Sequence, residues 1–481
     1  MTATKTCHTL VIGGGPGGYP AAIRAGQLGL DTVLVEAGRL GGTCLIRGCI
    51  PSKAIIHAAS KVEDMRGHAN GGAGSMGITL PSPPKLDMAG LRDWKDGLVD
   101  TLSGGVSGLL RAAKVHHIRG WATFNTAKTC IVRTEGEDVE ITAENVILAT
   151  GSQETELPFL PFGEHVISST GALDLTEVPE TLAVIGAGYI GMELGIAFAK
   201  LGAKVSFVEA GDTILPSYDA ELSRPVAAWL AGHNVGVHLG ARATGKGTSK
   251  GKQVLKFEDA DGKARTLRAD KILVAVGRRP RTEGWGLEAM GVDMDRAFIK
   301  VDARCETAMR GVYAIGDVTG EPMLAHRATA MGEAAAEAIA GRKSRFDPRA
   351  VAAVCFTEPE LVGVGLTPDE ARASGQEVIV GKFPMAASGR ALSMAAGASK
   401  GLVRVTARKS DHLILGIHAV GAHVAELSGE FALAMEMGAV LEDLAGTIHV
   451  HPTLGETVME SALAALGHPI HIAASAGRPR R

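Results

Sequence analysis

Two cysteines, Cys44 and Cys49, offer the clearest chemistry in the sequence. Four residues separate them, a spacing poorly suited to a zinc site and well suited to a reversible disulfide. In a continuous helix their Cα atoms would lie about 8 to 9 Å apart, further than a disulfide reaches, so the backbone has to bend between them. Gly48 presents the least side-chain obstacle to that bend. The pattern predicts a redox-active disulfide that opens and closes during turnover.

The residues before this pair predict a nucleotide-binding turn. A short β-branched run, Thr9–Ile12, leads into a glycine-rich turn and then into an alanine-rich helical stretch. Gly13 suits a tight turn, Gly15 lets a pyrophosphate approach the backbone, and Gly18 lets helix and strand pack closely. Glu36 ends the next strand, 23 positions after Gly13, where an acid binds ribose hydroxyls. Together these features predict a bound dinucleotide.

A second fingerprint of the same kind follows in the middle of the chain. Gly186, Gly188 and Gly191 come directly after a short apolar strand, and Glu209 again lies 23 positions beyond the first glycine. Two fingerprints predict two dinucleotides. A carboxylate at position 209 would repel the additional phosphate of NADP, so the second site is predicted to take NAD.

Composition places the chain among ordinary globular proteins. Its 481 residues are too many for one core, and a net charge of -3 without a basic stripe argues against nucleic acid as a partner. A polar N-terminus and the lack of a long apolar run predict a soluble, cytoplasmic protein without a membrane span. The remaining cysteines are far apart in the sequence and are predicted to be free thiols: Cys7, Cys130, Cys305 and Cys355.

The run Gly41–Lys53, which contains both closely spaced cysteines, resembles the redox segment of the flavin-dependent pyridine nucleotide disulfide oxidoreductases. Its Ile-Pro-Ser-Lys ending is most similar to the dihydrolipoamide dehydrogenases among them. The resemblance implies that Cys44 exchanges thiols with the substrate, that Cys49 contacts the flavin, and that Lys53 lies near the reactive edge of the flavin. One departure is Arg47, a cation inside the disulfide loop, which should favour thiolate over thiol.

The same resemblance implies which cofactor each fingerprint binds. The first fingerprint, joined to the disulfide run, would bind FAD, and the second would bind NAD. Glu193, in the helix after the second fingerprint, would pair with Lys53. The resemblance implies further cofactor-site residues where the chain leaves each dinucleotide domain, in a later Gly-Asp motif that binds the ribityl chain, and in a segment under the isoalloxazine ring: Thr150, Gly151, Gly277, Asp317, Met323, Leu324, Ala325 and His326.

A histidine near the C-terminus is the candidate base. Dithiol oxidation requires a group that takes a proton from the incoming thiol, and histidine has a suitable pKa. His451 lies in a His-x-His-Pro-Thr motif that closely matches the family's terminal motif, in which the peptide bond before Pro452 is typically cis. Glu456 can orient the imidazole ring through its second nitrogen, whereas His449 is predicted to be a structural neighbour. In the family this base comes from the partner subunit, so a homodimer is expected.

The predicted fold is α/β. It has two Rossmann-like dinucleotide-binding domains. The resemblance implies that these bind FAD and NAD, and that the C-terminal α+β segment is a dimerisation domain. The expected parts are residues 1–152 with the FAD site and disulfide, 153–278 with the NAD site, 279–351 completing the FAD site, and 352–481 for dimerisation. Within the first part, Met65–Pro84 is rich in Gly, Ser and Pro and predicts a surface excursion.

The resemblance implies oxidation of protein-bound dihydrolipoamide to lipoamide by NAD⁺, through the Cys44–Cys49 disulfide and FAD. The expected partners are a lipoyl-bearing domain and the acyltransferase core of a 2-oxo acid dehydrogenase complex. Three alternatives remain: a related FAD reductase acting on another disulfide, a non-catalytic flavoprotein subunit, and a metal site joining the cysteines to His449 and His451. The cysteine spacing argues against the metal site, and none is predicted.

Overall fold

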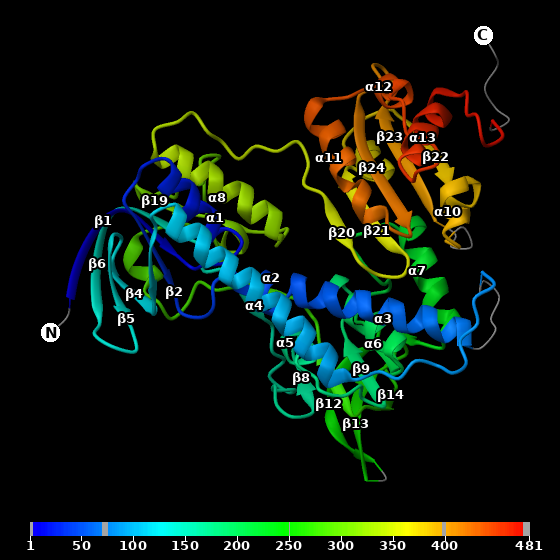
Figure 1. Cartoon of the computed structure of the whole chain (residues 1–481), viewed down its shortest axis with the longest axis horizontal. Helices are drawn as coiled ribbons and strands as arrows, with labels where there is room; N and C mark the ends of the chain where they lie inside the picture. Colours follow the sequence, from blue (N-terminus) through cyan, green and yellow to red (C-terminus); the bar gives the residue numbers. More distant parts are fainter. Residues whose placement is uncertain (1–2, 70–75, 250, 397–400, 475–481) are drawn as a thin grey trace.

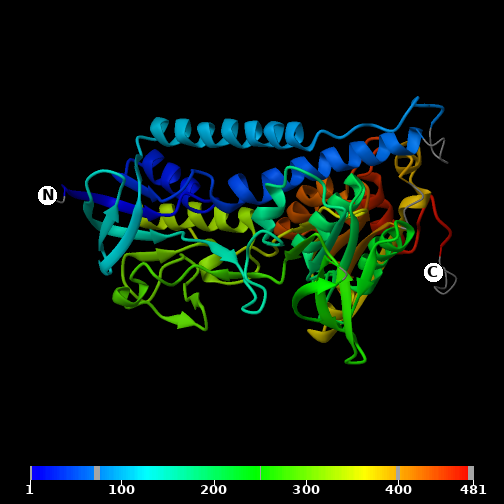
Figure 2. The same cartoon turned by 90° about the horizontal axis from the view of Figure 1, so that it is seen from below.

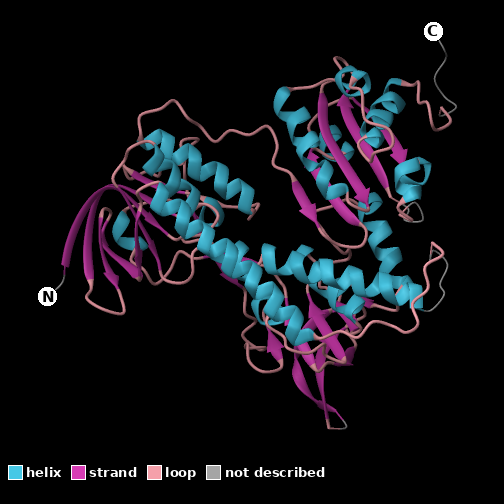
Figure 3. Cartoon of the chain, in the orientation of Figure 1, coloured by secondary structure: helices cyan, strands magenta, loops and turns pink. Residues whose placement is uncertain are grey.

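The computed structural model describes residues 3–69, 76–249, 251–396 and 401–474, and three large sheets with their helices organise this part of the chain (Figure 1, Figure 3). The first and second sheets are connected by a long helix, and the third sheet lies beside the second at the C-terminal end of the molecule (Figure 1). This arrangement confirms the predicted α/β fold with a third, α+β unit.

The first sheet combines a parallel half with an antiparallel half. Its order is β3-β2-β1-β6-β5-β4, with β19 beside β6. Strand β1 begins six residues before the predicted Thr9, because its first half pairs with β6 from Ala3 and Val139 onward. The strands are β1 (Ala3–Ile12), β2 (Thr32–Glu36), β3 (His116–Arg119), β4 (Trp121–Thr126), β5 (Thr129–Arg133), β6 (Val139–Leu148) and β19 (Val312–Ala314).

Helices on the first sheet carry the redox segment and the first glycine turn. Helix α1 (Gly18–Gln27) packs against α8 (Ala325–Ile339), and α2 (Gly42–Arg47) leads directly into α3 (Cys49–Ala69). Helix α4 (Met88–Ala112) lies along the outside of α3 (Figure 2). Because α3 extends to Ala69, the predicted surface excursion is wrong for residues 65–69, and residues 70–75 lie outside the described residues.

The second sheet is parallel throughout, in the order β11-β10-β9-β15-β8. Helix α6 (Tyr189–Leu201) packs on it closely because Gly195 has no side chain, and a Cβ there would lie 2.3 Å from the ring of the buried Phe207. Helix α3 packs on the other side of α6 and so joins the two sheets. The other elements are β8 (Val166–Ile167), α5 (Ser169–Leu173), β9 (Thr181–Ile185), β10 (Lys204–Val208), α7 (Ala220–Gly232), β11 (Gly236–His238), β12 (Arg242–Ser249), β13 (Lys252–Glu258), β14 (Ala264–Arg268) and β15 (Lys271–Val274).

Two short strands mark where the chain passes between the first and second units. Strand β7 (Ser152–Glu154) follows β6 of the first sheet, β16 (Arg278–Pro280) follows β15 of the second, and the two pair antiparallel. The chain then returns to the first sheet and completes it with β19. Between β16 and α8 lie η1 (Leu287–Met290), β17 (Met294–Asp295), β18 (Phe298–Ile299) and η2 (Gly316–Thr319).

The third sheet is antiparallel, in the order β20-β21-β24-β23-β22. Helix α13 (Glu456–Leu466) covers one face, while α7 of the second unit contacts β24. The remaining elements are β20 (Ala353–Cys355), β21 (Glu360–Gly365), α9 (Pro368–Ala373), β22 (Val378–Pro384), η3 (Met385–Ala387), α10 (Gly389–Ser393), β23 (Leu402–Arg408), β24 (Ile414–Gly421), η4 (Val424–Leu427), α11 (Ser428–Met437) and α12 (Leu441–Gly446). Among the described helices, none has both the length and the apolar character needed to cross a bilayer.

Candidate active site

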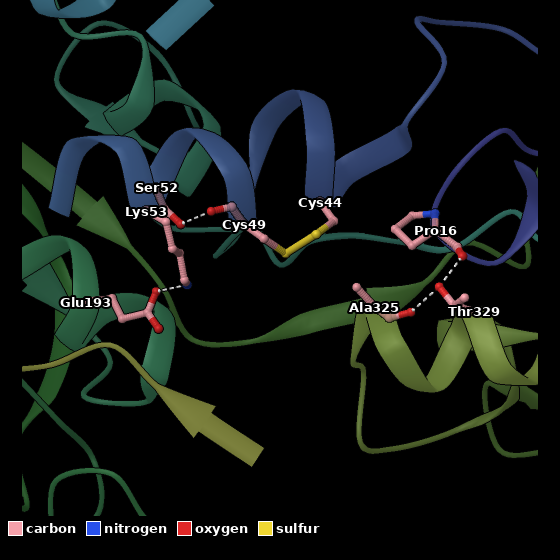
Figure 4. Close-up of a disulfide and its surroundings, with 8 residues drawn as sticks. All are labelled: Pro16, Cys44, Cys49, Ser52, Lys53, Glu193, Ala325 and Thr329. Atoms are coloured by element: carbon pink, nitrogen blue, oxygen red, sulfur yellow. Dashed lines mark hydrogen bonds and ion pairs between the residues drawn. A yellow bond between two sulfur atoms is a disulfide. The ribbon is translucent and has the colours of Figure 1, made fainter. Parts of the chain in front are cut away.

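Cys44 and Cys49 form a disulfide at the junction of α2 and α3 (Figure 4). Their Cα atoms are 4.6 Å apart, far closer than in a continuous helix. The predicted bend is at Gly48, where α2 ends and α3 begins one residue later. A Cβ on Gly48 would lie 2.8 Å from the carbonyl oxygen of Thr43, so any other residue would push this turn apart.

A cavity that is open to solvent, with about 1270 Å³ of empty space including its mouth, extends from the first glycine turn to the disulfide. It joins segments that are remote in the sequence. Arg47, the cation in the disulfide loop, is exposed and also lies in the wall. The predicted residues that line the cavity are Gly13, Gly15, Glu36, Cys44, Cys49, Lys53, Thr150, Gly151, Glu193, Asp317, Met323 and Ala325.

The glycines of the first turn are required by close packing on one side and by the open cavity on the other. Gly13 has φ +102°, and a Cβ there would lie 2.3 Å from the carbonyl oxygen of Ala149. A Cβ on Gly18 would lie 1.8 Å from the carbonyl oxygen of Gly13. A Cβ on Gly15, in contrast, would have only the Cα of Gly42 within 4 Å, at 3.7 Å. The N-terminus of α1 therefore faces free space that a diphosphate fits.

A second cavity, also open to solvent and with about 1220 Å³ of empty space including its mouth, adjoins the first. The predicted residues in its wall are Gly186, Gly188, Glu209, Gly277 and Met323. A Cβ on Gly188 would meet nothing within 4 Å, whereas one on Gly191 would lie 2.2 Å from the carbonyl oxygen of Gly186. The second turn thus repeats the design of the first, with one open glycine and one packed glycine. The residues that line both cavities are Tyr189, Ile190, Arg278 and Met323, so the two spaces share a wall.

The two acids that end β2 and β10 have equivalent surroundings. Glu36 accepts hydrogen bonds from the backbone N–H groups of Gly14 and Gly38, both at 2.7 Å. Glu209 accepts a corresponding pair of backbone hydrogen bonds at 2.6 and 2.7 Å. These bonds fix each carboxylate at the edge of its cavity, in the position at which a dinucleotide's ribose is bound in a fold of this kind.

An ion pair joins the redox helix to the second unit. Lys53 Nζ lies 2.6 Å from Glu193 Oε2, so the pair expected from the family resemblance is formed (Figure 4). Glu193 is only 4% exposed, and its Oε1 accepts a hydrogen bond of 2.9 Å from the backbone N–H of Phe356. The ring of Phe356 lies 4.5 Å from Lys53 Nζ. No sequence motif points to Phe356, because it comes from the third unit and belongs to none of the motifs.

The start of α8 and the residues just before it form part of the wall of the first cavity. Met323 and Ala325 line the cavity, and Leu324 is the residue that precedes the helix. The side chain of His326 is directed elsewhere, with Nε2 2.8 Å from the carbonyl oxygen of Ala352. Thr329 ties α8 to the glycine turn through a hydrogen bond of 2.8 Å to the carbonyl oxygen of Pro16 (Figure 4).

His451 and Glu456 form a hydrogen-bonded pair before and at the start of α13. His451 Nδ1 lies 2.8 Å from Glu456 Oε1, and the N–H of Thr453 donates to Glu456 Oε2 at 2.8 Å. Burial acts to raise the pKa of Glu456, but the hydrogen bonds from His451 and Thr453 outweigh it and hold the pKa below its usual value. The bond between His451 and Pro452 is cis, as the resemblance implied. His449 Nε2 is occupied by Glu430 at 2.8 Å, in accord with a structural role.

Within one chain, this pair is not brought to the disulfide. His451 lines neither of the two cavities, and its side chain is 78% exposed. Helix α13 lies in the third unit, away from α2 in both views (Figure 1, Figure 2).

The other four cysteines are free, as predicted, and the structure shows that all four are buried. Burial raises the pKa of the Cys7 thiol to about 11 and those of Cys130 and Cys305 to about 12. Burial also raises the pKa of Cys355 well above its usual value. These thiols remain protonated at neutral pH and do not compete with Cys44 or Cys49 as nucleophiles.

Comparison with known proteins agrees with this geometry. The dihydrolipoyl dehydrogenase of Pseudomonas aeruginosa is 52% identical over 473 residues, covering 98% of this chain and 100% of that protein. The enzyme of the same name from Bacillus subtilis is 44% identical, covering 96% and 97%. Among solved structures, LpdA from Mycobacterium tuberculosis matches with a TM-score of 0.86 and 27% identity, covering 95% of this chain and 99% of that one. The HOCl-induced flavoprotein disulfide reductase RclA from Escherichia coli matches at 0.83 and 26%, with the same coverage.

Family models cover almost all of the described chain. Residues 7–332 match the pyridine nucleotide-disulphide oxidoreductase model, and residues 351–462 match the dimerisation domain of the same family. The disulfide lies in the first matched region and the His451–Glu456 pair in the second. On this evidence the chain belongs to the pyridine nucleotide-disulphide oxidoreductases, a family of oxidoreductase enzymes.

Proposed function

We propose that this chain is a dihydrolipoyl dehydrogenase, which oxidises protein-bound dihydrolipoamide to lipoamide and reduces NAD⁺ to NADH. The observation that carries the proposal is the Cys44–Cys49 disulfide in the wall of a cavity that begins at one dinucleotide fingerprint and adjoins a second. An electron path from a dithiol to a nicotinamide requires such a sequence of sites. The names and near-complete coverage of the relatives support this substrate.

The dithiol reaction uses the disulfide and the histidine pair. Since Nδ1–H of His451 donates to Glu456, its Nε2 is free to take a proton from a substrate thiol, and the carboxylate stabilises the imidazolium. The substrate thiolate attacks Cys44, the Cys44–Cys49 bond breaks, and Cys49 leaves as a thiolate. The second substrate sulfur then displaces Cys44, which closes the lipoamide disulfide and leaves both cysteines reduced.

FAD, when bound in the first cavity, supplies the step from the reduced cysteines to NAD⁺. The open face at Gly15 and the carboxylate of Glu36 fit its diphosphate and ribose. We assign the FAD site to Gly13, Gly15, Gly18, Glu36, Lys53, Thr150, Gly151, Glu193, Asp317, Met323, Leu324, Ala325 and His326. For His326 the contribution is its backbone, because its side chain is bonded to Ala352.

The NAD site is assigned to the second cavity, with Gly186, Gly188, Gly191, Glu209 and Gly277. The open space at Gly188 fits a second diphosphate. The carboxylate of Glu209 favours NAD over NADP, because the additional phosphate of NADP would meet a negative charge.

The working unit is a homodimer, in which His451 of one protomer acts on the disulfide of its partner. The dimerisation-domain match supports this, and so does a group of exposed apolar side chains around the histidine motif: Leu433, Met437, Ile448 and Val450. We further propose a cytoplasmic location, the lipoyl domain and acyltransferase core of a 2-oxo acid dehydrogenase complex as partners, and the four-part division at residues 152, 278 and 351.

The test is turnover by the FAD-loaded homodimer, measured as NADH formation from dihydrolipoamide, with NAD⁺ and NADP⁺ compared in parallel. Cys49→Ser should abolish turnover, and His451→Gln should lower it at least about 100-fold while FAD stays bound. Cys7→Ser is the matched control, since that thiol is buried away from both cavities, and it should retain activity. Reduction of a different disulfide without dihydrolipoamide oxidation, or binding of both cofactors without turnover, would disprove the proposal.

A further inference from the structure

Ser152 lies where the chain leaves the first sheet, and nothing in the sequence motifs assigns it a role. It is 5% exposed and lines the first cavity. Its hydroxyl contacts two charged side chains, with Arg278 Nε at 2.8 Å and Asp317 Oδ2 at 2.5 Å. Arg278 Nη2 also donates to the carbonyl oxygen of Ser152 at 3.0 Å. Residues from three separate segments therefore meet at one buried hydroxyl.

The chemistry of the three groups fixes the direction of these hydrogen bonds. A guanidinium can only donate, so the Ser152 oxygen accepts from Arg278. The single hydroxyl proton is then available to Asp317, whose ionised carboxylate can only accept. Arg278 therefore donates to Ser152, and Ser152 donates to Asp317. Each of these two hydrogen bonds involves one charged group, which makes it short and strong.

The backbone holds the hydrogen-bonded residues Arg278, Ser152 and Asp317 in place. Strands β7 and β16 pair antiparallel, with Pro280 opposite Ser152, so Arg278 enters from the strand that leaves the second sheet. Arg278 lies in the wall of both cavities, whereas Asp317 lies in the wall of the first. Ser152 and Arg278 thus both lie in the paired strands through which the chain passes between the first and second units.

We propose that Ser152 is a positioning residue of the FAD site. It holds one carboxylate oxygen of Asp317, Oδ2, so that the carboxylate keeps the orientation needed to accept a ribityl hydroxyl, and Arg278 holds Ser152. The inference rests on the proposed function, in which Asp317 binds the ribityl chain. Without the Ser152 hydroxyl, the carboxylate is free to rotate away from the cofactor, and its contact with the ribityl chain weakens.

The test compares FAD with ADP, which has the adenosine and diphosphate but no ribityl chain. Full-length protein is stripped of FAD, checked for recovery of activity on re-addition, and titrated with each ligand by calorimetry. Ser152→Ala should weaken FAD binding about tenfold, as loss of one hydrogen bond to a charged group does, and change ADP binding by less than about twofold. Ser152→Thr keeps a hydroxyl and should recover most of the FAD affinity.

Two further variants make the result decisive. Ser152→Cys keeps the size of the side chain but donates poorly, so it should show the same FAD loss even if the alanine variant folds badly. Ser461→Ala removes a buried hydroxyl of the third unit, bonded to the carbonyl oxygens of Val403 and Thr457, and should leave FAD binding unchanged. Unchanged FAD affinity in the alanine and cysteine variants, or an equal loss for ADP, would overturn the inference. Failure of the wild-type protein to bind FAD would instead overturn the proposed function.

Discussion

Replacing His418 by glutamine should change how the stability of this protein depends on pH. His418 lies on β24 and is 4% exposed, and its Nδ1 has no hydrogen-bond partner among the described residues. Arg404 of β23 lies directly opposite in the sheet, and Gly363 of β21 lies on the other side. Arg404 in turn forms ion pairs with α7 of the second unit, so His418 is part of the contact that holds the third unit in place.

The surroundings of His418 disfavour its protonated form. Burial lowers its pKa most, and the charge of Arg404 lowers it further. Asp219 and Glu370 act in the opposite direction, but the pKa still falls to about 4 from a usual value of 6.5. Because the folded-state pKa lies below the unfolded-state pKa, the unfolded chain takes up a proton in this window and the folded chain does not. Stability is therefore lost as the pH falls from about 6.5 to about 4.

The size of the effect follows from the shift. A difference of this size corresponds to about 3 kcal/mol of unfolding free energy over the whole window. Between pH 7 and pH 5 the loss is about 2 kcal/mol, because the unfolded chain is almost fully protonated at this histidine by pH 5 and the folded chain is not. Glutamine cannot take up a proton, so this part of the pH dependence should disappear in the variant.

The assay is urea unfolding of the wild type and of His418→Gln at pH 7 and pH 5. The drop in unfolding free energy between the two pH values should be about 2 kcal/mol smaller in the variant. His468→Gln, at an exposed position, is the control and should show the wild-type pH dependence. If the wild type and His418→Gln lose the same stability on acidification, the reasoning about burial and Arg404 is refuted.

Glu456→Gln should lower dihydrolipoamide turnover about 100-fold, since the amide cannot stabilise the imidazolium of His451. The control is Glu442→Gln, because Glu442 pairs with His412 at the surface, and it should leave steady-state rates unchanged. Gly18→Ala should abolish FAD binding, because its Cβ would lie 1.8 Å from a backbone oxygen of the same turn. The loss would be seen as absence of the yellow colour in the purified protein. A variant that keeps its flavin would show that the turn can open. Glu209→Ser should raise the ratio of kcat/KM for NADP⁺ to that for NAD⁺ at least about tenfold, and an unchanged ratio would show that the carboxylate does not select the cofactor.

Local features of the sequence are sufficient to predict the residues at the chemical core of the site. The Cys44–Cys49 spacing and Gly48 required a bend in the backbone, and α2 ends at that point. The glycines of both turns and the acid 23 positions later identified two dinucleotide folds, because strand, tight turn and helix packing are encoded within about 30 consecutive residues. The His451–Glu456 hydrogen bond also lies within one short segment.

Extended segments without motifs were predicted less well. The α3 helix continues five residues into a stretch whose composition predicts a loop, because its packing on α6 outweighs the weak helix preference of Gly67 and His68. Strand β19 has only three residues, and its place beside β6 depends on pairing between positions 312 and 146. Such pairing leaves no periodic pattern in a run this short.

The electron-carrying cysteines, the two fingerprints and the candidate base can be recognised from the sequence, since each depends on residues near one another in the chain. Their surroundings depend on tertiary packing, which places Phe356 on the Lys53–Glu193 pair and Ser152 between Arg278 and Asp317. These contacts join residues more than 100 positions apart, and each uses a backbone N–H or an ordinary side chain that no motif distinguishes. Their hydrogen bonds form only after distant segments of the chain have packed together, so no local pattern in the sequence could specify them.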